Sequence, residues 1–90
     1  MPGPWISQHR LSWNANTEPD LAGYRVYAGR SSGTYGSLSS PIDVGNVLFY
    51  DWPINASGQW FFVVKAYDTS NNESEPSAEV SANWLLLGNF

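Results

Sequence analysis

The chain has 90 residues, the size of one small domain, and such a chain buries only roughly 60–65% of the surface of its unfolded state. It has no cysteine, so its stability has to come from packing, and an aromatic content of 16% supplies large side chains for that purpose. The net charge is −4, and the four basic residues form no run or stripe. This charge pattern excludes nucleic acid and anionic membrane surfaces as expected partners.

Two targeting features are absent from the sequence. The first residues lack the basic stretch and the apolar stretch that are typical of a signal peptide. The longest apolar run, residues 84–87, is far shorter than the ~20 residues that a membrane-spanning helix needs. We therefore expect a soluble domain without membrane insertion.

The first half of the chain reads as short strands separated by turns. Residues 1–4 contain two prolines and a glycine, which exclude regular structure, and the apolar pair Trp5 and Ile6 follows. Alternating polar and apolar residues, bounded by turn residues, predict strands over 9–14, 21–28, 41–46 and 47–52. In the second of these strands, Tyr24, Val26 and Ala28 are expected to face inward.

Residues 60–68 are predicted to form the central strand of the fold. The segment is rich in aromatic and β-branched residues, and turn residues precede and follow it. With a period of two, one face carries Trp60, Phe62, Val64 and Ala66, and the other carries Phe61, Val63, Lys65 and Tyr67. A last strand is predicted over 77–84. Six or seven short strands without a helical period predict an all-β fold, an antiparallel sandwich of two sheets.

The sequence resembles a fibronectin type III domain, especially the bacterial and phage versions. The matching segments, in order, are 11–13, 18–27, 43–46, 64–70, 72–74 and 76–77. The resemblance covers roughly residues 9–83, and it implies an immunoglobulin-like sandwich on an extracellular protein, a cell surface or a virion. We take 1–90 as one domain, with its core over 9–83 and an apolar C-terminal extension over 84–90. The family is a scaffold with many tasks, so the resemblance implies little about function.

Three features depart from the family pattern. Only eight residues precede His9, so the first strand is expected to be truncated or missing. Trp60 occupies the position of a tyrosine whose hydroxyl bonds back to the backbone, and an indole N–H donates but does not accept. The chain also continues beyond the last family strand into a segment that is rich in large apolar residues, which we expect to dock.

No catalytic residues are expected. His9 is the only histidine and reads as a surface residue, and no thiol is present to act as a nucleophile. Glu18 and Asp20 lie in a turn-rich loop rather than in a cleft that would place a glycosidase pair. No cofactor is therefore implied, and an enzyme ranks last among the functional classes.

No metal site is expected either. Oxygen ligands for a hard cation cluster at Asp68, Asn71, Asn72 and Glu73, but they lack calcium-loop spacing. Turns favour the same residue types for their own backbone hydrogen bonds. Asn55 and Asn72 each begin a pattern that fits N-glycosylation, which matters only in a host that glycosylates.

The outer face of the central strands has two alternative interpretations. Tyr27, Phe61, Val63 and Tyr67 all point away from the inferred core and form an apolar patch, which is typical of an interface or a carbohydrate-stacking surface. Alternatively, they form ordinary cross-strand pairs with Arg25 and Lys65 laid over them. The sequence leaves both open.

The apolar extension suggests assembly. A sandwich without its first strand exposes a sheet edge, and residues 84–90 are predicted to cover it within the chain or as a strand donated to a neighbour. Donation would give a dimer or a filament. The alternative is that 4–8 form a short first strand and the extension plays no part. The residues expected to interact are Trp84, Leu85, Leu86, Leu87, Phe90, Trp5, Tyr27, Phe61, Val63 and Tyr67.

We therefore expect a non-catalytic structural or protein-interaction module that assembles through an exposed sheet edge and its C-terminal apolar segment. Its expected partner is a protein, including a second copy of the chain. The alternative is an accessory module of an extracellular bacterial enzyme, which binds polysaccharide or another ligand through the outer aromatic residues.

Overall fold

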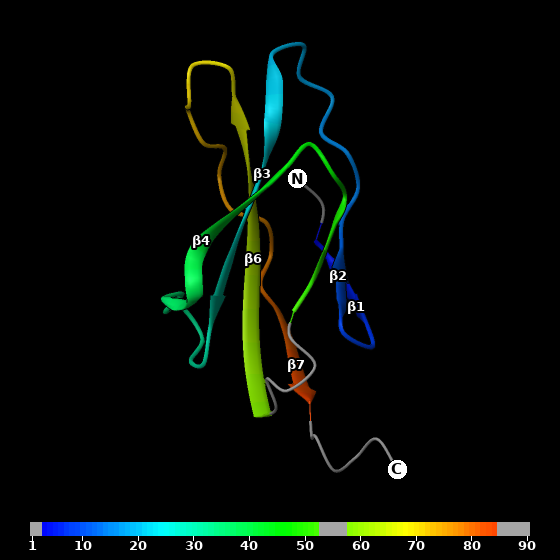
Figure 1. Cartoon of the computed structure of the whole chain (residues 1–90), viewed down its shortest axis with the longest axis vertical. Coiled ribbons are helices and arrows are strands. Elements are labelled where there is room, and N and C mark those ends of the chain that lie inside the picture. Colours follow the sequence, from blue (N-terminus) through cyan, green and yellow to red (C-terminus); the bar gives the residue numbers. More distant parts are fainter. Residues whose placement is uncertain (1–2, 53–57, 85–90) are drawn as a thin grey trace.

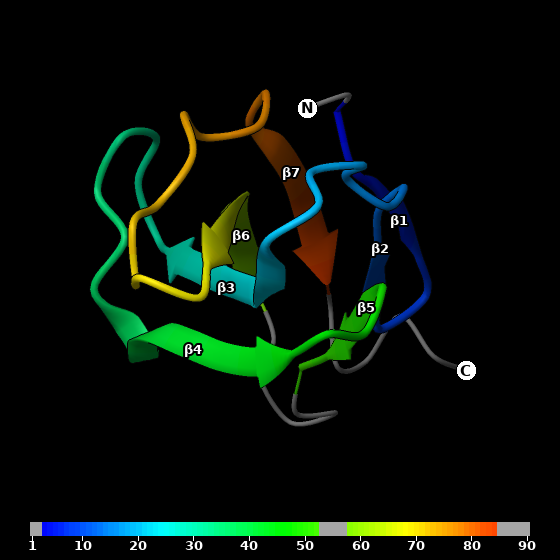
Figure 2. The same ribbon diagram turned by 90° about the horizontal axis from the view of Figure 1, so that it is seen from above.

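A computed structural model describes residues 3–52 and 58–84 and shows an all-β chain, in which these residues form no helix (Figure 1). The strands are β1 (Trp5–Ser7), β2 (Arg10–Ser12), β3 (Leu21–Gly29), β4 (Ser37–Gly45), β5 (Phe49–Asp51), β6 (Gly58–Asp68) and β7 (Val80–Trp84). They form two antiparallel sheets, with the orders β1-β2-β5 and β4-β3-β6-β7. The predicted two-sheet, sandwich-like all-β class is confirmed. Figure 2 shows the smaller sheet at one side of the larger one.

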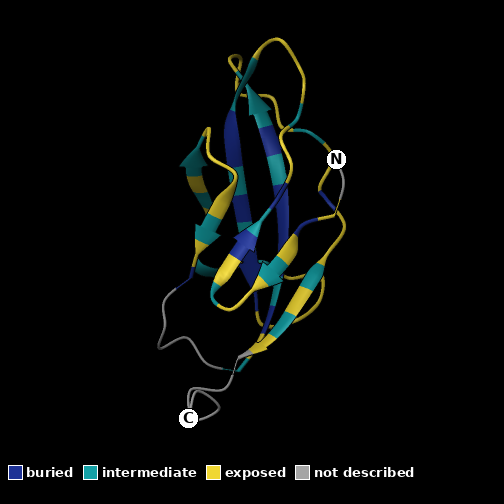
Figure 3. Cartoon of the chain, turned by 90° about the vertical axis from the view of Figure 1, so that its right-hand side faces the viewer, coloured by how far each residue is buried: buried dark blue, intermediate teal, exposed yellow. Residues whose placement is uncertain are grey.

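β6 is central, as predicted, because it pairs with β3 on one side and β7 on the other. Its inward residues are almost fully buried, and so are the inward residues of β3 (Figure 3). These predicted core residues are Trp60, Phe62, Val64, Ala66, Tyr24, Val26 and Ala28. Burying a large apolar side chain contributes roughly 1.5–3 kcal/mol, so the pairing of β3 with β6 holds most of the apolar stabilisation of this small domain.

Aromatic rings connect the two sheets. Trp13, which follows β2, lies with its ring centroid 5.6 Å from that of Tyr24 in β3. Trp52, which follows β5, lies 4.9 Å from Phe62 in β6. Leu11 of β2 is fully buried between these contacts. Such tilted ring pairs add about 0.5–1.5 kcal/mol to the burial of their area.

The first strand is short rather than missing. β1 pairs with β2 from Trp5↔Ser12 to Ser7↔Arg10, with a turn of two residues between the strands. Gln8 in this turn has a positive φ of 56°. The turn contains neither glycine nor asparagine, the residues that usually mark such a turn, so the sequence placed His9 inside a strand. The alternative of a short first strand within 4–8 is what the structure shows.

Two other strands differ in length from the prediction. β4 begins at Ser37 rather than at Pro41, and it shows two register shifts against β3. β5 covers three residues instead of 47–52. The sequence before Pro41 is rich in serine and glycine, which reads as loop although its backbone pairs with Ala28.

β7 begins at Val80 rather than at residue 77, because the preceding segment binds β6 in another way. The hydroxyl of Ser77 accepts the N–H of Val64 over 2.9 Å, and the hydroxyl of Ser74 accepts that of Ala66 over 2.9 Å. The N–H of Ser77 in turn donates to the carbonyl of Val64. Pro76 between the two serines has no N–H to donate, so the side chains take the place of a regular ladder.

The loop between β3 and β4 folds over the outer face of the larger sheet. It is held there by Glu79, whose carboxylate accepts hydrogen bonds from the Ser32 hydroxyl at 2.6 Å and the Gly33 N–H at 3.1 Å, and from the Tyr35 hydroxyl. These hydrogen bonds lower the pKa of Glu79, and the bond from the Ser32 hydroxyl has the largest effect. The loop thus covers the end of β3, where Gly29 pairs with Phe61.

Gly29 permits this close approach, and its replacement is the first test. A Cβ at position 29 would overlap the carbonyl oxygen of Thr34 and lie 2.7 Å from its carbonyl carbon. We therefore expect Gly29→Ala to lower the free energy of unfolding by about 1–3 kcal/mol, measured by urea denaturation, because backbone must shift. Gly36→Ala is the matched control, since a Cβ there meets nothing within 4 Å. Equal stability of the two variants would contradict the tight packing of the loop.

Candidate functional site

The structure brings the side chains of the predicted outer patch together on β3 and β6. Two of its rings, Tyr27 and Tyr67, lie beneath Lys65 and Arg25. The guanidinium of Arg25 lies 3.9 Å from the ring centroid of Tyr67, and the ammonium of Lys65 lies 4.8 Å from that of Tyr27. Cation–π contacts of this kind contribute about 0.5–1 kcal/mol at exposed sites. Both tyrosines therefore present a ring face that is already occupied.

The other two patch residues are also covered. Val63 was expected to point to solvent and is only 5% exposed, which corrects that expectation. In the register of β3 and β6 it lies directly opposite Tyr27, and the neighbouring pair on the same two strands towards the other end is Arg25 and Lys65. Phe61 is half-buried and lies opposite Gly29, where the β3–β4 loop crosses.

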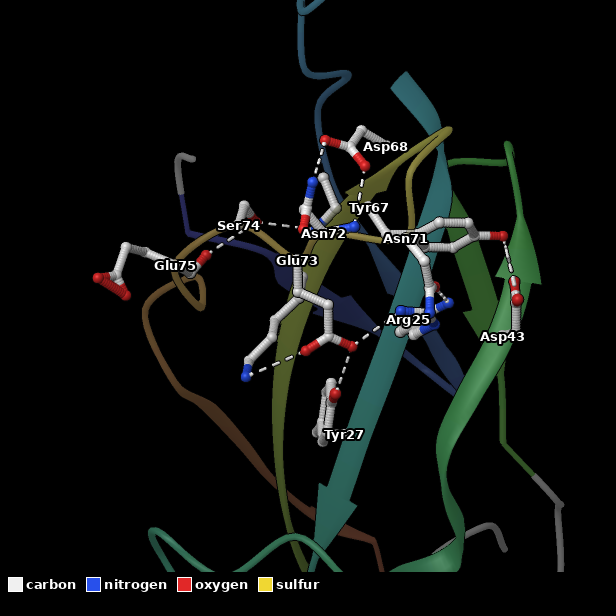
Figure 4. Close-up of polar contacts among 12 residues, drawn as sticks. Arg25, Tyr27, Asp43, Tyr67, Asp68, Asn71, Asn72, Glu73, Ser74 and Glu75 are labelled. Carbon is white, nitrogen blue, oxygen red and sulfur yellow. Dashed lines mark hydrogen bonds and ion pairs between the residues drawn. The ribbon is translucent and has the colours of Figure 1, made fainter. Parts of the chain in front are cut away.

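Glu73 is the centre of the polar network on this face (Figure 4). Its Oε2 accepts the Tyr27 hydroxyl over 2.7 Å and Arg25 Nη1 over 3.1 Å, and its Oε1 lies 3.5 Å from Lys65 Nζ. Arg25 also donates to the side-chain oxygen of Asn71. One carboxylate thus orients both cations over the two aromatic rings.

A second carboxylate anchors the other tyrosine. The Tyr67 hydroxyl donates to Asp43 of β4 at 2.8 and 3.0 Å from its two oxygens. The tyrosine reaches β4 by lying across Gly23 of β3, where a Cβ would be 2.7 Å from the tyrosine oxygen. The bond therefore connects the edge strand to the central strand over a glycine that leaves the space.

These contacts shift the pKa values in opposite directions. Burial, reinforced by the hydrogen bond to Glu73, raises the pKa of Tyr27 to about 12. The hydrogen bond from Tyr27 has the largest effect on Glu73 and, together with Arg25 and Lys65, lowers the pKa of that carboxyl. The Gly45 N–H and the Tyr67 hydroxyl lower the pKa of Asp43, and the pKa of Tyr67 rises. Paired shifts of this kind stabilise the folded structure.

The candidate metal ligands make hydrogen bonds within the protein, either in their own turn or to Arg25. Asp68 Oδ1 accepts the N–H groups of Ser70 and Asn72 at 2.9 and 2.8 Å. Glu73 and Asn71 belong to the network around Arg25. Within 3–52 and 58–84, no group of three or more histidine, cysteine or acidic side chains is placed to hold a metal ion.

His9 belongs to a pocket at the β1–β2 turn. It is half-buried rather than on the surface, and its ring centroid lies 5.8 Å from that of Trp52. The pocket has a volume of about 450 Å³ and is lined by Ser7, Gln8, His9, Arg10, Asp51 and Trp52. Both oxygens of Asp51 accept hydrogen bonds from Arg10, at 2.8 and 3.0 Å, so this carboxylate is held in an ion pair rather than as a base.

Among the residues that the structure describes, the two largest exposed apolar side chains lie on the smaller sheet. Trp5 of β1 and Phe49 of β5 are 46% and 42% exposed, and both pair with Ser12 of β2, so they flank it on one face. Val47 and Leu48, just before β5, are also exposed. Trp5 was among the predicted interaction residues. Phe49 was not, although it lies within the predicted strand 47–52.

The apolar extension is described only at its first residue. Trp84 is the last residue of β7, and its backbone pairs with Gly58. Its side chain lies outside the described part of the structure, as do the predicted interaction residues Leu85, Leu86, Leu87 and Phe90. The structure therefore places the start of the extension at the end of an edge strand.

The network around Glu73 predicts a pH-dependent stability. Because the folded state lowers the pKa of Glu73, its contribution is present above the usual carboxyl pKa of about 4.3 and is lost as the pH falls below it. We expect Glu73→Gln to lower the free energy of unfolding by about 1 kcal/mol at pH 7 and by little at pH 2–3. Denaturation curves across this range would measure the effect. Glu75→Gln, outside the network, is the control, and a Glu73→Gln effect that persists at low pH would contradict the interpretation.

Comparison with known protein families, with curated proteins and with solved structures found no match for the chain. The resemblance to fibronectin type III domains therefore rests on the residue pattern alone. The described residues form no helix that is long and apolar enough to cross a membrane.

Proposed function

We propose that the chain is a non-catalytic structural or protein-interaction module with a fibronectin type III-like fold. The residue pattern supports this family, and so does the order of the strands. In a constant-type immunoglobulin domain the fourth strand joins the sheet of the first, second and fifth. Here β4 pairs with β3 instead, which leaves a sheet of three strands and a sheet of four. The family resemblance also supports a location on a cell surface, on a virion or on a secreted protein.

The observation that carries the proposal is the position of β7. It is the edge strand of the larger sheet, and its last residue, Trp84, is the first residue of the apolar segment. An edge strand presents unpaired backbone groups, and a following apolar segment adds side chains that gain from burial. We propose that the edge and residues 84–90 together form the assembly surface. The short β1 removes the need to replace a missing first strand, so the proposal assigns the segment to a neighbour rather than to that position.

The test compares the full chain with a chain that ends after Trp84. This boundary keeps every paired residue of β7, which a truncation after Asn83 would not. We expect the full chain to self-associate in size exclusion with light scattering, and the shorter chain to remain folded and to self-associate more weakly. Leu86→Ser/Leu87→Ser in the full chain is the matched variant, because it keeps the length and removes apolar area.

The melting temperature of each variant separates assembly from folding. If the shorter chain melts with the full chain and both are monomers at every concentration, the segment does not act in assembly and the proposal fails. If the shorter chain is unfolded, the double-serine variant decides: a folded monomer supports the proposal, and an unchanged oligomer contradicts it.

Polysaccharide binding remains a second candidate, on different residues from those expected. Tyr27 and Tyr67 have covered rings, whereas Trp5 and Phe49 flank Ser12 with their Cα atoms about 10 Å apart, two strand spacings. Arg10 lies 4.2 Å from the Phe49 centroid, so Trp5 offers the more open ring. A sugar ring that stacks on an aromatic side chain needs such an open face.

Affinity electrophoresis in gels that contain soluble polysaccharides tests this candidate. The polysaccharide-binding candidate predicts that the chain is retarded and that Trp5→Ala, but not Tyr27→Phe, abolishes the retardation. Absence of retardation, or equal retardation of the Trp5→Ala variant, would exclude the stacking surface. Assembly through β7 predicts no retardation.

A further inference from the structure

The four edge strands of the sandwich differ in how they are protected against pairing with another chain. β1 and β5 have three residues each, and very short edge strands offer little for pairing. β4 contains Pro41, which has no N–H, and it shows two register shifts against β3. Prolines and irregularities of this kind are common means of blunting an edge.

β7 has none of these three protections, although β1 of the smaller sheet lies close to it. It covers five residues, Val80–Trp84, and pairs with β6 without a register shift from Phe62↔Val80 to Gly58↔Trp84. It contains no proline, glycine or charged residue. The nearest charge, Glu79, is held over the outer face by the β3–β4 loop, as described above, and so is directed away from the edge.

The sequence of β7 is complementary to itself in one antiparallel register. Residues directly opposite each other in an antiparallel pair point to the same face, so a two-fold axis has to pass through a residue rather than between two residues. An axis at Ala82 uses the whole strand. It places Ala82 opposite its own copy, Ser81 opposite Asn83 of the second copy, and Val80 opposite Trp84 of the second copy.

This register matches the two faces of the strand. Ser81 and Asn83 are exposed. In this register the hydroxyl of Ser81 faces the amide of Asn83 of the second copy, and the two groups are able to form a hydrogen bond. Val80 and Ala82 are half-buried and pack against the core. By register, apolar residue types thus meet at positions 80, 82 and 84, and polar types meet at 81 and 83, with no like charges opposed.

We propose that β7 pairs with β7 of a second copy of this chain around a two-fold axis at Ala82, which joins the two larger sheets into one continuous sheet. The pairing rests on the proposed function and makes it specific, since it names the edge and the partner. It also predicts a closed dimer rather than a filament, because each copy uses its only unblunted described edge.

The pairing alone gives a weak dimer. A five-residue strand is about 17 Å long, and its edge buries far less than the roughly 800 Å² per partner of a standard stable interface. We therefore expect a monomer–dimer equilibrium at protein concentrations between about 10 μM and 1 mM, not an obligate dimer.

Charge substitutions at the two exposed positions test the register in the full chain. In Ser81→Lys/Asn83→Lys, each lysine at 81 opposes the lysine at 83 of the second copy. Ser81→Glu/Asn83→Glu opposes like charges in the same way. We expect each variant alone to dimerise at least about threefold more weakly than the original chain in sedimentation equilibrium. An equimolar mixture of the two is expected to recover dimerisation as a heterodimer, because each lysine then meets a glutamate.

Near-ultraviolet circular dichroism is the control for folding, and we expect both variants to fold because positions 81 and 83 are exposed. If both variants dimerise like the original chain, or the mixture recovers nothing, the β7 pairing is wrong. If that happens while removal of 85–90 abolishes the oligomer, the proposed function stands without this pairing. If the full chain stays monomeric up to about 1 mM, self-assembly fails as a whole.

Discussion

The structure depends on the pairing of β6 with β3, because these two strands are covered on both faces. Their register runs from Leu21↔Asp68 to Gly29↔Phe61 and fixes which side chains face the second sheet. A slip of one residue would exchange the inward residues with Arg25, Tyr27, Lys65 and Tyr67. The network around Glu73 opposes such a slip, since its cations and hydroxyls come from both strands. The polar outer face therefore specifies the same register as the apolar core.

This arrangement explains why aromatic content alone was a poor guide to a binding surface. Tyr27 and Tyr67 carry polar hydroxyls, and both find carboxylates on segments far along the chain, Glu73 and Asp43. Arg25 and Lys65 lie over the two rings and cover one face of each. A small domain without disulfides gains stability in this way outside its core.

The sequence predicted the central strand, the inward residues of β3 and β6 and the two-sheet class, because these follow from alternation along a single segment. It did not predict the β1–β2 turn, since Gln8 adopts a positive φ that glycine or asparagine normally provides. It also missed the part of Glu79 in holding the β3–β4 loop, and the serine hydroxyls that replace a ladder beside β6. These contacts join residues from 8 to 47 positions apart, and no local pattern encodes them. The covered state of Val63 has the same origin.

The treatment of the edges follows a related logic. A sandwich of seven strands has four edges, and each is a site of unwanted association unless it is short, irregular or charged. Protection at β4 uses Pro41, and it costs regular hydrogen bonds with β3, which the Ser40 hydroxyl replaces in part by accepting the N–H of Ala28 over 2.8 Å. β7 keeps a regular ladder with β6 and has no such compensation to make. The regular ladder of β7 is therefore the reason why the proposed assembly is placed at this edge and not at β4.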